Sequence, residues 1–236
     1  MSMLTARRCT PELMDDPNVD RAELEASLRF IRTVNRRLGG AAAVLKHLQR
    51  WSADWSSRQT IRILDLGTGS ADIPLAISDW AAASQHPVHI TAVDLHETTL
   101  AVARDQVGER GDIELVQADA RHLTDRFEPR AFDYAHAGMF LHHLGDIEVM
   151  TVLRIMDRLT TRGLIWNDLV RGPIEKLAVR VLTIRAPAMV KHDAVVSVAA
   201  GFTRREVLEL AKRVGLETPT YHRHLFGRFT LVSEKA

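Results

Sequence analysis

The sequence contains little cysteine and no long apolar run, and both shortages narrow the classes of protein to which it can belong. Cys9 is the single cysteine among 236 residues, which excludes an internal disulfide and a zinc site built from several cysteines. No apolar stretch approaches the roughly 20 residues that a membrane-spanning helix needs, and the first residues lack the apolar core of a secretory signal. We therefore expect a cytoplasmic protein with no membrane span and no metal site.

An excess of charge of either sign is also missing. The chain has 31 Lys and Arg against 30 Asp and Glu, a formal net charge of +1. Such a balance gives no strong field for nucleic acid or for an anionic membrane, and no basic stripe or repeat stands out. With 46% hydrophobic residues, the composition is that of one large globular domain, or of one domain with an appendage.

The most distinctive stretch runs from Ile61 to Pro74 and reads IRILDLGTGSADIP. Its run of β-branched and leucine residues, stopped by Gly-x-Gly, is typical of a buried parallel strand that turns tightly into a helix. Gly67 and Gly69 allow the backbone to bend and to approach a ligand without a Cβ in the way. The turn is therefore expected to bind a cofactor.

Acidic residues around the glycines indicate which cofactor this is. Dinucleotide-binding turns place pyrophosphate on the helix N-terminus and have Gly or Ala at the third glycine position, which here is Asp72. A carboxylate there repels phosphate, and Asp65 adds a second negative charge that suits a cation. S-adenosylmethionine (SAM) carries a sulfonium and an amino group and no phosphate. The segment DLGTGSAD resembles the first motif of class I SAM-dependent methyltransferases, with Ala71 in place of the last glycine.

Strand and helix patterns alternate from Thr60 onwards. We expect strands at 61–66, 89–95, 113–119, 132–137 and 163–168, separated by helices at 71–84, 97–109 and 146–160. This order predicts an α/β fold with a Rossmann-like, doubly wound parallel sheet. Thr203 and Glu206 cap a late helix, and residues 217–224 and 226–234 read as a terminal hairpin. By resemblance to the methyltransferases, this hairpin is an antiparallel pair that completes a seven-stranded sheet.

Two amphipathic helical segments precede the sheet. Asp20 and Glu23 form a capping box at the start of the first segment, and Gly39 and Gly40 end it. The pair is too small to fold alone, so we expect it to pack on the main domain. In the methyltransferases that the chain resembles, such helices form a lid over cofactor and acceptor. We therefore divide the chain into a helical lid at 1–58 and a SAM-dependent methyltransferase domain at 59–236.

Acidic or small residues stand at the ends of four consecutive strands, where open α/β sheets bind their ligands. Asp94 ends the second strand, and a carboxylate there accepts hydrogen bonds from both ribose hydroxyls of SAM or of NAD. Asp119 and the next residue resemble the family motif that meets the adenine, although each acid alone is also compatible with a helix cap. The residues expected to bind SAM and its product S-adenosylhomocysteine (SAH) are Asp65, Gly67, Thr68, Gly69, Asp94, Leu95, Asp119, Ala120 and Ala137.

Two further segments resemble a bacterial group of small-molecule methyltransferases that act on ubiquinone and menaquinone precursors and on polyketide-type phenols. These are HAGMFLHHLGD after the fourth strand and the N-terminal stretch from Glu12 to Gly40. The resemblance implies that Asn35 on the first helix faces the methionine carboxylate or the acceptor; the alternative is a solvated polar residue. The expected acceptor is a small aromatic or hydrophobic molecule with a hydroxyl group, methylated on oxygen or on carbon.

Methyl transfer to a hydroxyl group requires removal of a proton, for which histidine has a suitable pKa. His142 and His143 follow the fourth strand and are candidate bases, although a histidine that packs or caps the next helix fits the same pattern. His192 and Asp193 are placed in a loop after an apolar helix bounded by Pro187, where they form a second candidate pair.

The segment after the fifth strand is where this fold usually covers its acceptor. Asp168 and Arg171 lie at the strand end and, with Asn35 and Asp193, are candidate substrate-binding residues. The apolar residues of this segment either line an acceptor pocket or belong to the core. They are Val179, Leu182, Ile184, Met189, Val190, Val195 and Val196.

The sequence is also compatible with functions other than methyl transfer to a small molecule. A SAM-binding protein that no longer transfers methyl groups, serving as a partner subunit or a recruited cyclase or decarboxylase, would show the same motifs. An NAD(P)-dependent reductase is disfavoured by Asp72 and by the terminal hairpin. Nucleic acid is an unexpected substrate, because the chain has AGMF where base-methylating enzymes carry an Asn/Asp-Pro-Pro-aromatic motif. A homodimer formed through the exposed helical pair is a further candidate assembly.

Overall fold

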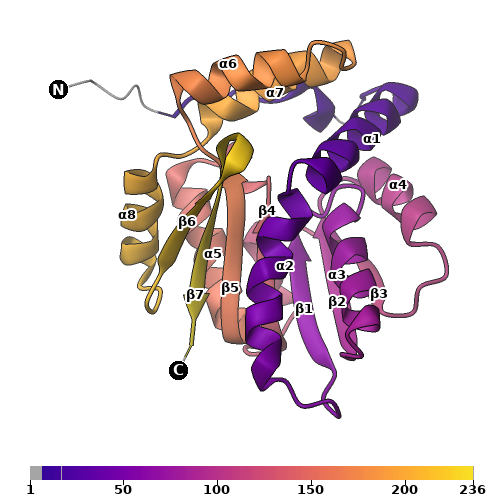
Figure 1. Ribbon diagram of the computed structural model, residues 1–236, viewed down its shortest axis with the longest axis vertical. Coiled ribbons are helices and arrows are strands. Elements are labelled where there is room, and N and C mark those ends of the chain that lie inside the picture. The colour runs from indigo at the N-terminus through magenta and orange to yellow at the C-terminus, as the bar shows by residue number, and fades with distance from the viewer. Residues whose placement is uncertain (1–6, 17, 236) are drawn as a thin grey trace.

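The computed structural model describes residues 7–16 and 18–235, whose central feature is a seven-stranded sheet (Figure 1). The strand order is β3-β2-β1-β4-β5-β7-β6, with β7 antiparallel to both of its neighbours. The sheet confirms the predicted fold, including the antiparallel terminal hairpin. The strands are β1 Ile61–Leu66, β2 Val88–Asp94, β3 Ile113–Gln117, β4 Phe132–Gly138, β5 Thr160–Leu169, β6 Thr220–His224 and β7 Arg228–Glu234.

Helices cover both faces of the sheet and its upper edge (Figure 1). One face packs against α2 (Gly40–Trp51), α3 (Asp72–Ala83) and α4 (Glu97–Val107), and the other packs against α5 (Asp146–Leu159) and α8 (Arg204–Val214). The upper edge lies under α1 (Arg21–Arg37), α6 (Pro173–Leu182) and α7 (Ala188–Ala200). Short 3-10 helices are η1 Leu13–Asp15, η2 Ser52–Asp54, η3 Ala120–Asp125, η4 Leu141–His143 and η5 Leu225–Gly227.

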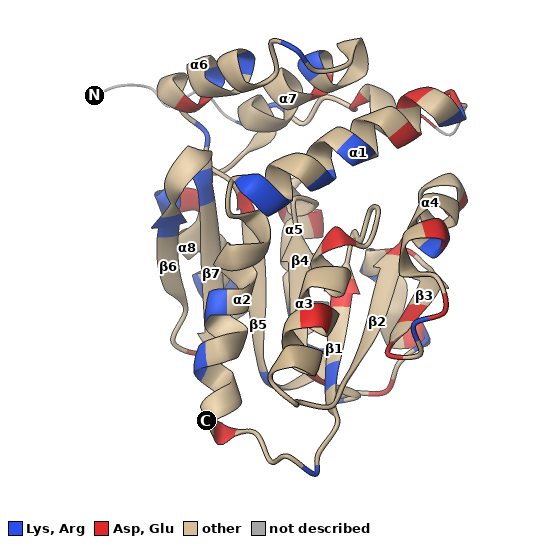
Figure 2. Ribbon diagram, turned by 45° about the vertical axis from the view of Figure 1, so that its right-hand side comes forward, with Lys and Arg blue, Asp and Glu red and all other residues tan. Residues whose placement is uncertain are grey.

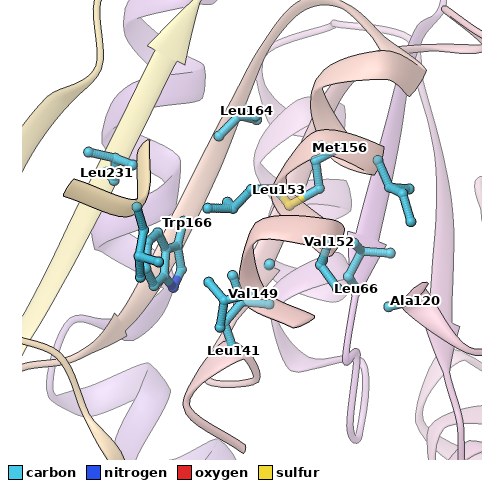
Figure 3. Packing of buried hydrophobic residues seen from close by; sticks show 14 of the residues in the cluster. Leu66, Ala120, Leu141, Val149, Val152, Leu153, Met156, Leu164, Trp166 and Leu231 are labelled. Atoms are coloured by element: carbon cyan, nitrogen blue, oxygen red, sulfur yellow. The ribbon is translucent and has the colours of Figure 1, made fainter. Parts of the chain in front are cut away.

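The larger hydrophobic core fills the space between the sheet and α5 (Figure 3). The side chains of Val149, Leu153 and Met156 on α5 lie at helical spacing and are fully buried against the strands. Trp166 of β5 packs edge-on against Phe202 and Phe229 at ring-centroid distances of 4.7 and 5.2 Å. This rigid packing holds the upper ends of the strands, where the ligand-binding residues begin.

The helical pair ahead of the sheet forms as predicted, but its two helices take different positions. Asp20 caps α1 by accepting a hydrogen bond from the Glu23 backbone N–H at 3.0 Å, and α1 then lies across the upper edge of the sheet (Figure 1). In contrast, α2 buries Leu48 and Trp51 in the core of the sheet face. The division into a helical lid at 1–58 and a methyltransferase domain at 59–236 stays a prediction. Residues 1–6 of the predicted lid lie outside the described residues.

The segment between β5 and α8 corrects one expectation. His192 and Asp193 belong to α7 and do not lie in a loop. Pro187 stands immediately before α7 and begins this helix, because proline lacks a backbone N–H that the first turn would leave unpaired anyway. The late capping box is confirmed, since the Thr203 hydroxyl and the Glu206 carboxylate cap α8 reciprocally. Within the part of the chain that the structure describes, no helix is long and apolar enough to cross a membrane.

Candidate functional site

Two adjoining cavities lie at the carboxyl edge of the parallel strands, beneath α1 and α7. The first has a volume of about 240 Å³ and the second about 290 Å³. The first extends from the glycine turn to α6 and α7, whereas the second extends toward β2 and β3. The residues that line both cavities, and so mark their junction, are Met14, Leu28, Gly67, Gly69, Met139 and His143.

The glycine turn forms the floor of this junction. Gly67 and Gly69 have φ angles of +65° and +56°, which favour glycine. A Cβ on Gly67 would lie 2.6 Å from the Cβ of Phe140, so no larger residue fits while the two loops remain this close. Thr68 also lines the first cavity, and within residues 7–16 and 18–235 its buried Oγ1 has no hydrogen-bond partner. The predicted turn is therefore formed and leaves a polar atom for a ligand.

Asp94 is fixed in position by the glycine turn itself. Its carboxylate accepts hydrogen bonds from the backbone N–H of Gly69 at 2.9 Å and of His96 at 3.1 Å. Burial raises the pKa of Asp94, while these backbone hydrogen bonds oppose the increase. Asp94 and Leu95 line the second cavity. A carboxylate held in this way is ready to accept hydrogen bonds from a ribose without rearranging.

The remaining predicted cofactor residues differ in their access to the cavities. Asp119 and Ala120 line the second cavity, and Arg121 binds both oxygens of the Asp119 carboxylate, lowering its pKa. Ala137 is fully buried, does not appear in the lining of either cavity, and leaves this position to its neighbour Gly138. Around Asp119, the second cavity is therefore lined by the small side chain of Ala120 and by the Asp119–Arg121 ion pair.

Asp65 and Asp72 place two carboxylates in the wall of the first cavity. Asp65 is buried and lies 2.5 Å from Nδ1 of His136 on β4. Burial raises the pKa of Asp72, and the nearby Asp65 carboxylate raises it further, although a hydrogen bond from Asn35 opposes them. The site therefore favours a ligand that brings positive charge, as the sequence predicts.

Asn35 on α1 hydrogen-bonds two charged residues in the wall of the first cavity, Asp72 and Arg228. Its Nδ2 donates to Asp72 at 2.8 Å and its Oδ1 accepts from the Arg228 guanidinium at 2.6 Å. Arg228 is buried in β7, and burial lowers its pKa while Asp72 and Asp168 oppose that decrease. All three groups line the first cavity, so a ligand there meets an acid and a guanidinium side by side. A zwitterionic amino acid end has this pattern of charge.

His142 is buried beside the same cavity, between two carboxylates. Its Nδ1 lies 2.6 Å from Asp168 Oδ1, and its Nε2 lies 3.4 Å from Glu12 Oε1. Burial alone would lower the pKa of His142, but Asp168 and Glu12 raise it to about 10. Asp168 also accepts hydrogen bonds from the backbone N–H of Leu169 and from the Trp166 indole. Asp168 is thus placed to orient His142 and is not among the cavity-lining residues.

Residues 12–15, which we call the N-terminal strap, close over the two histidines. Asp15 lies 2.8 Å from Nδ1 of His143, and Glu12 accepts a hydrogen bond from the Ser197 hydroxyl. The backbone N–H groups of Leu13 and Met14 donate to the Asp193 carboxylate at 2.9 and 3.1 Å. Asp193 therefore holds the strap, although it also lines the first cavity.

Among the described residues, Glu12, His142 and His143 each offer one ligand atom, and these atoms lie within 4.8 Å of one another, a spacing that a metal ion could bridge. The two imidazoles are at the same time paired with Asp168 and Asp15, and Glu12 with Ser197. Each of the three side chains therefore already has a hydrogen-bond partner within the protein.

The other predicted site residues lie elsewhere. His192 is about half exposed, lies 2.9 Å from Asp193, and is absent from the lining of both cavities. Arg171 donates to the Gly201 carbonyl at 2.5 Å and to Glu206 at 2.6 Å, so it joins β5 to α8 outside the cavities. Of the seven apolar residues expected at a pocket or in the core, Val179, Leu182 and Val190 line the first cavity.

Several polar residues that line the first cavity were not predicted as site residues, among them Glu12, His136 and Arg228, and Asn167 was placed at a strand end without a role. Two of them carry buried atoms without a hydrogen-bond partner among the described residues, namely His136 Nε2 and Asn167 Oδ1. His136 and Asn167 stand at strand ends next to positions that the sequence did single out. Glu12 and Arg228, in contrast, come from opposite ends of the chain and carry no local signal.

Residues 63–163 match a family described as methyltransferase domain, and they contain the glycine turn, Asp94, Asp119 and the two histidines of η4. By sequence, this stretch is therefore similar to a methyltransferase domain. The fold resembles that of a SAM-dependent methyltransferase from Aquifex aeolicus, with a TM-score of 0.64 and 14% identity over 92% of this chain and 100% of that one.

Two further relatives place this methyltransferase domain among known proteins. Magnesium protoporphyrin IX methyltransferase from Synechocystis PCC 6803, solved with bound SAH, matches with a TM-score of 0.57 and 13% identity over 85% of each chain. A demethylmenaquinone methyltransferase from Bacillus cytotoxicus is 32% identical over 114 residues, which are 45% of this chain and 46% of that protein. The aligned sequence thus spans about half the length of this curated relative.

Proposed function

We propose that this chain transfers the methyl group of SAM to a hydroxyl group of a small aromatic or hydrophobic molecule held in the first cavity. The observation that carries the proposal is the position of His142, a buried imidazole oriented by Asp168, in the wall of the cavity that also contains the glycine turn. Similarity to a demethylmenaquinone methyltransferase supports an acceptor with an aromatic or quinone-like ring. Methylation of carbon is the alternative outcome for the same arrangement.

The residues around the glycine turn fit the cofactor. SAM, when bound, supplies a methyl group on a positively charged sulfur. Asp72 and Arg228 are suited to the ammonium and carboxylate of its amino acid end, and Asp94 to its ribose hydroxyls. Thr68, His136 and Asn167 offer the unpaired buried atoms that such a polar ligand would satisfy.

The apolar part of the first cavity suits the acceptor. Leu28 and Val34 of α1 face Val179 and Leu182 of α6 and Val190 of α7 across it. An aromatic ring in this space would be removed from water, and its polar group would be directed toward the histidines. Displacement at the methyl carbon needs donor and acceptor in line with water excluded, and the apolar side chains of α1, α6 and α7 that line the cavity favour the exclusion of water.

His142 and its two carboxylates act on the proton of the acceptor. The His142 imidazole is held protonated between Glu12 and Asp168. The proton released as the oxygen–carbon bond forms and the carbon–sulfur bond breaks passes to the Glu12 carboxylate, which also lines the first cavity. The same imidazolium attracts a phenolate oxygen and so lowers the pKa of a phenol, which is ordinarily about 10. His143, held by Asp15, also lines the first cavity.

The proposal is tested by methyl transfer from radiolabelled SAM to a panel of phenolic acceptors. We expect His142→Asn to lower kcat by about 100-fold or more, as loss of a group that stabilises a developing oxyanion does, and to leave the Kd of SAH unchanged. His192→Asn is the matched control, because His192 lies outside both cavities, and its kcat should equal that of the wild type. An active His142→Asn enzyme would refute the assignment, and SAH binding without turnover on any acceptor would favour a non-transferring SAM-binding protein.

A further inference from the structure

Helix α6 is apolar on two opposite faces. Its inner face directs Val179 and Leu182 toward the first cavity. Its outer face carries Ile174, Leu177 and Val181, and the turn after the helix adds Ile184; these four side chains are 63% to 74% exposed. Their spacing of three, four and three residues places them on one side of the helix. An exposed apolar row of this length indicates a binding surface.

The hairpin turn between β6 and β7 extends this row. Leu225 is 79% exposed and Phe226 is half exposed, and the turn packs beside α6, where Gly227 approaches the Glu175 side chain. Figure 1 shows the turn at the upper end of the hairpin, close to the start of α6. We call these six residues the apolar face: Ile174, Leu177, Val181, Ile184, Leu225 and Phe226.

The charged side chains around the apolar face have one sign. Between residues 173 and 192, the exposed charged residues are Lys176, Arg180, Arg185 and Lys191, and Figure 2 shows the basic segments along α6. The nearby acid Glu175 is buried, and Arg223 of β6 pairs with it at 2.5 Å. The chain as a whole has a net charge of only +1, so this concentration of positive charge is local.

We propose that the apolar face docks on the surface of an anionic lipid bilayer. Amphipathic helices bind such surfaces by burying apolar side chains at the headgroup boundary while neighbouring Lys and Arg meet anionic lipids. A second copy of this chain is disfavoured as the occupant, because a twofold interface would place the same basic side chains of both copies opposite each other. The helix lies on the surface and does not cross it, which agrees with the length of the described helices.

Docking would also direct the first cavity toward the bilayer. Leu182 and Phe226 are both solvent-exposed and line the cavity, so its rim borders the apolar face. A hydrophobic acceptor would then reach the site from lipid with little exposure to water. This consequence rests on the proposed function, whereas the docking itself does not.

The test is co-sedimentation of the full chain with vesicles of phosphatidylcholine, with and without phosphatidylglycerol. We expect binding to the anionic vesicles that weakens in high salt. Ile174→Gln should weaken it by about tenfold and Arg180→Gln by about fivefold. The matched controls are Ile147→Gln, where the isoleucine is 77% exposed on α5, and Arg58→Gln in the exposed loop before β1; neither should change binding.

Three results would overturn the proposal. These are absence of binding to either vesicle, equal effects of the Ile147 and Ile174 substitutions, and a dimer in light scattering that Ile174→Gln dissociates, which would assign the face to a second copy. Methyl transfer to a water-soluble acceptor, measured on the same variants, separates this proposal from the proposed function. Retained transfer without vesicle binding refutes docking alone, and vesicle binding without transfer refutes the enzymatic role alone.

Discussion

Replacement of Asp94 should weaken cofactor binding by an amount that its surroundings define. The carboxylate is already held by the N–H groups of Gly69 and His96, so binding a ribose requires no ordering of the side chain. Hydrogen bonds to charged groups contribute about 1.5 to 3 kcal/mol, and we expect Asp94→Ala to lose this amount for the pair of hydroxyls. The Kd of SAH should therefore rise by roughly 10- to 150-fold.

Calorimetric titration with two nucleosides isolates this contribution from a general loosening of the turn. We compare 5′-methylthioadenosine with its 2′,3′-dideoxy analogue on the wild type and on Asp94→Ala. The substitution should weaken binding of the first ligand and leave the second nearly unaffected, because the analogue has no hydroxyl to donate. Asp54→Ala, an exposed acid near the end of α2, is the control. An equal loss for both ligands would refute the ribose assignment.

Three further outcomes are expected. Asp72→Asn should raise the melting temperature at neutral pH, because burial raises the pKa of Asp72 and the ionised form therefore destabilises the empty fold, while calorimetry should show about tenfold weaker SAH binding. Burial and nearby basic groups lower the pKa of His47 to about 4, so stability is fully present above pH ~6.5 and falls by about 2 to 3 kcal/mol as the pH decreases toward 4. Denaturant titrations should show this fall in the wild type and a flatter profile in His47→Gln. Turnover should survive EDTA, since Glu12, His142 and His143 already have hydrogen-bond partners within the protein; loss of activity that Zn²⁺ or Mn²⁺ restores would contradict this.

The strands and the glycine turn could be predicted because their signals are local. Alternation and β-branched content specify β1 and β2, and the capping box at Thr203 and Glu206 fixes the start of α8 to the residue. The boundaries of α7 could not be predicted in the same way. Its apolar residues face α6, the cavity and the strap, so no single stripe shows in the sequence, and Pro187 read as a loop signal where it begins a helix.

Only the part of the candidate site that lies at the strand ends could be predicted from the sequence. Asp94 and His142 follow strands, so the order of the sheet brings them to the same edge. Glu12 contacts His142 across 130 positions of sequence, and Arg228 contacts Asn35 across 193. Such pairs depend on how α1 and the strap lie over the sheet, and no local pattern encodes that. The net charge of the whole chain also gave no indication of the basic residues around α6, because acidic residues elsewhere in the chain offset their charge.

The contact between Asn35 and Arg228 has a consequence for how the chain completes its candidate site during synthesis. Residues 63–163 carry the glycine turn, Asp94 and His142. Glu12, which contacts His142, precedes this stretch, and Arg228, which contacts Asn35 in the wall of the first cavity, follows it. A nascent chain can thus build most of its sheet well before it can hold the cofactor. We therefore expect SAH binding to require the segments on both sides of residues 63–163, and an excised fragment of these residues to fold in part without gaining the site.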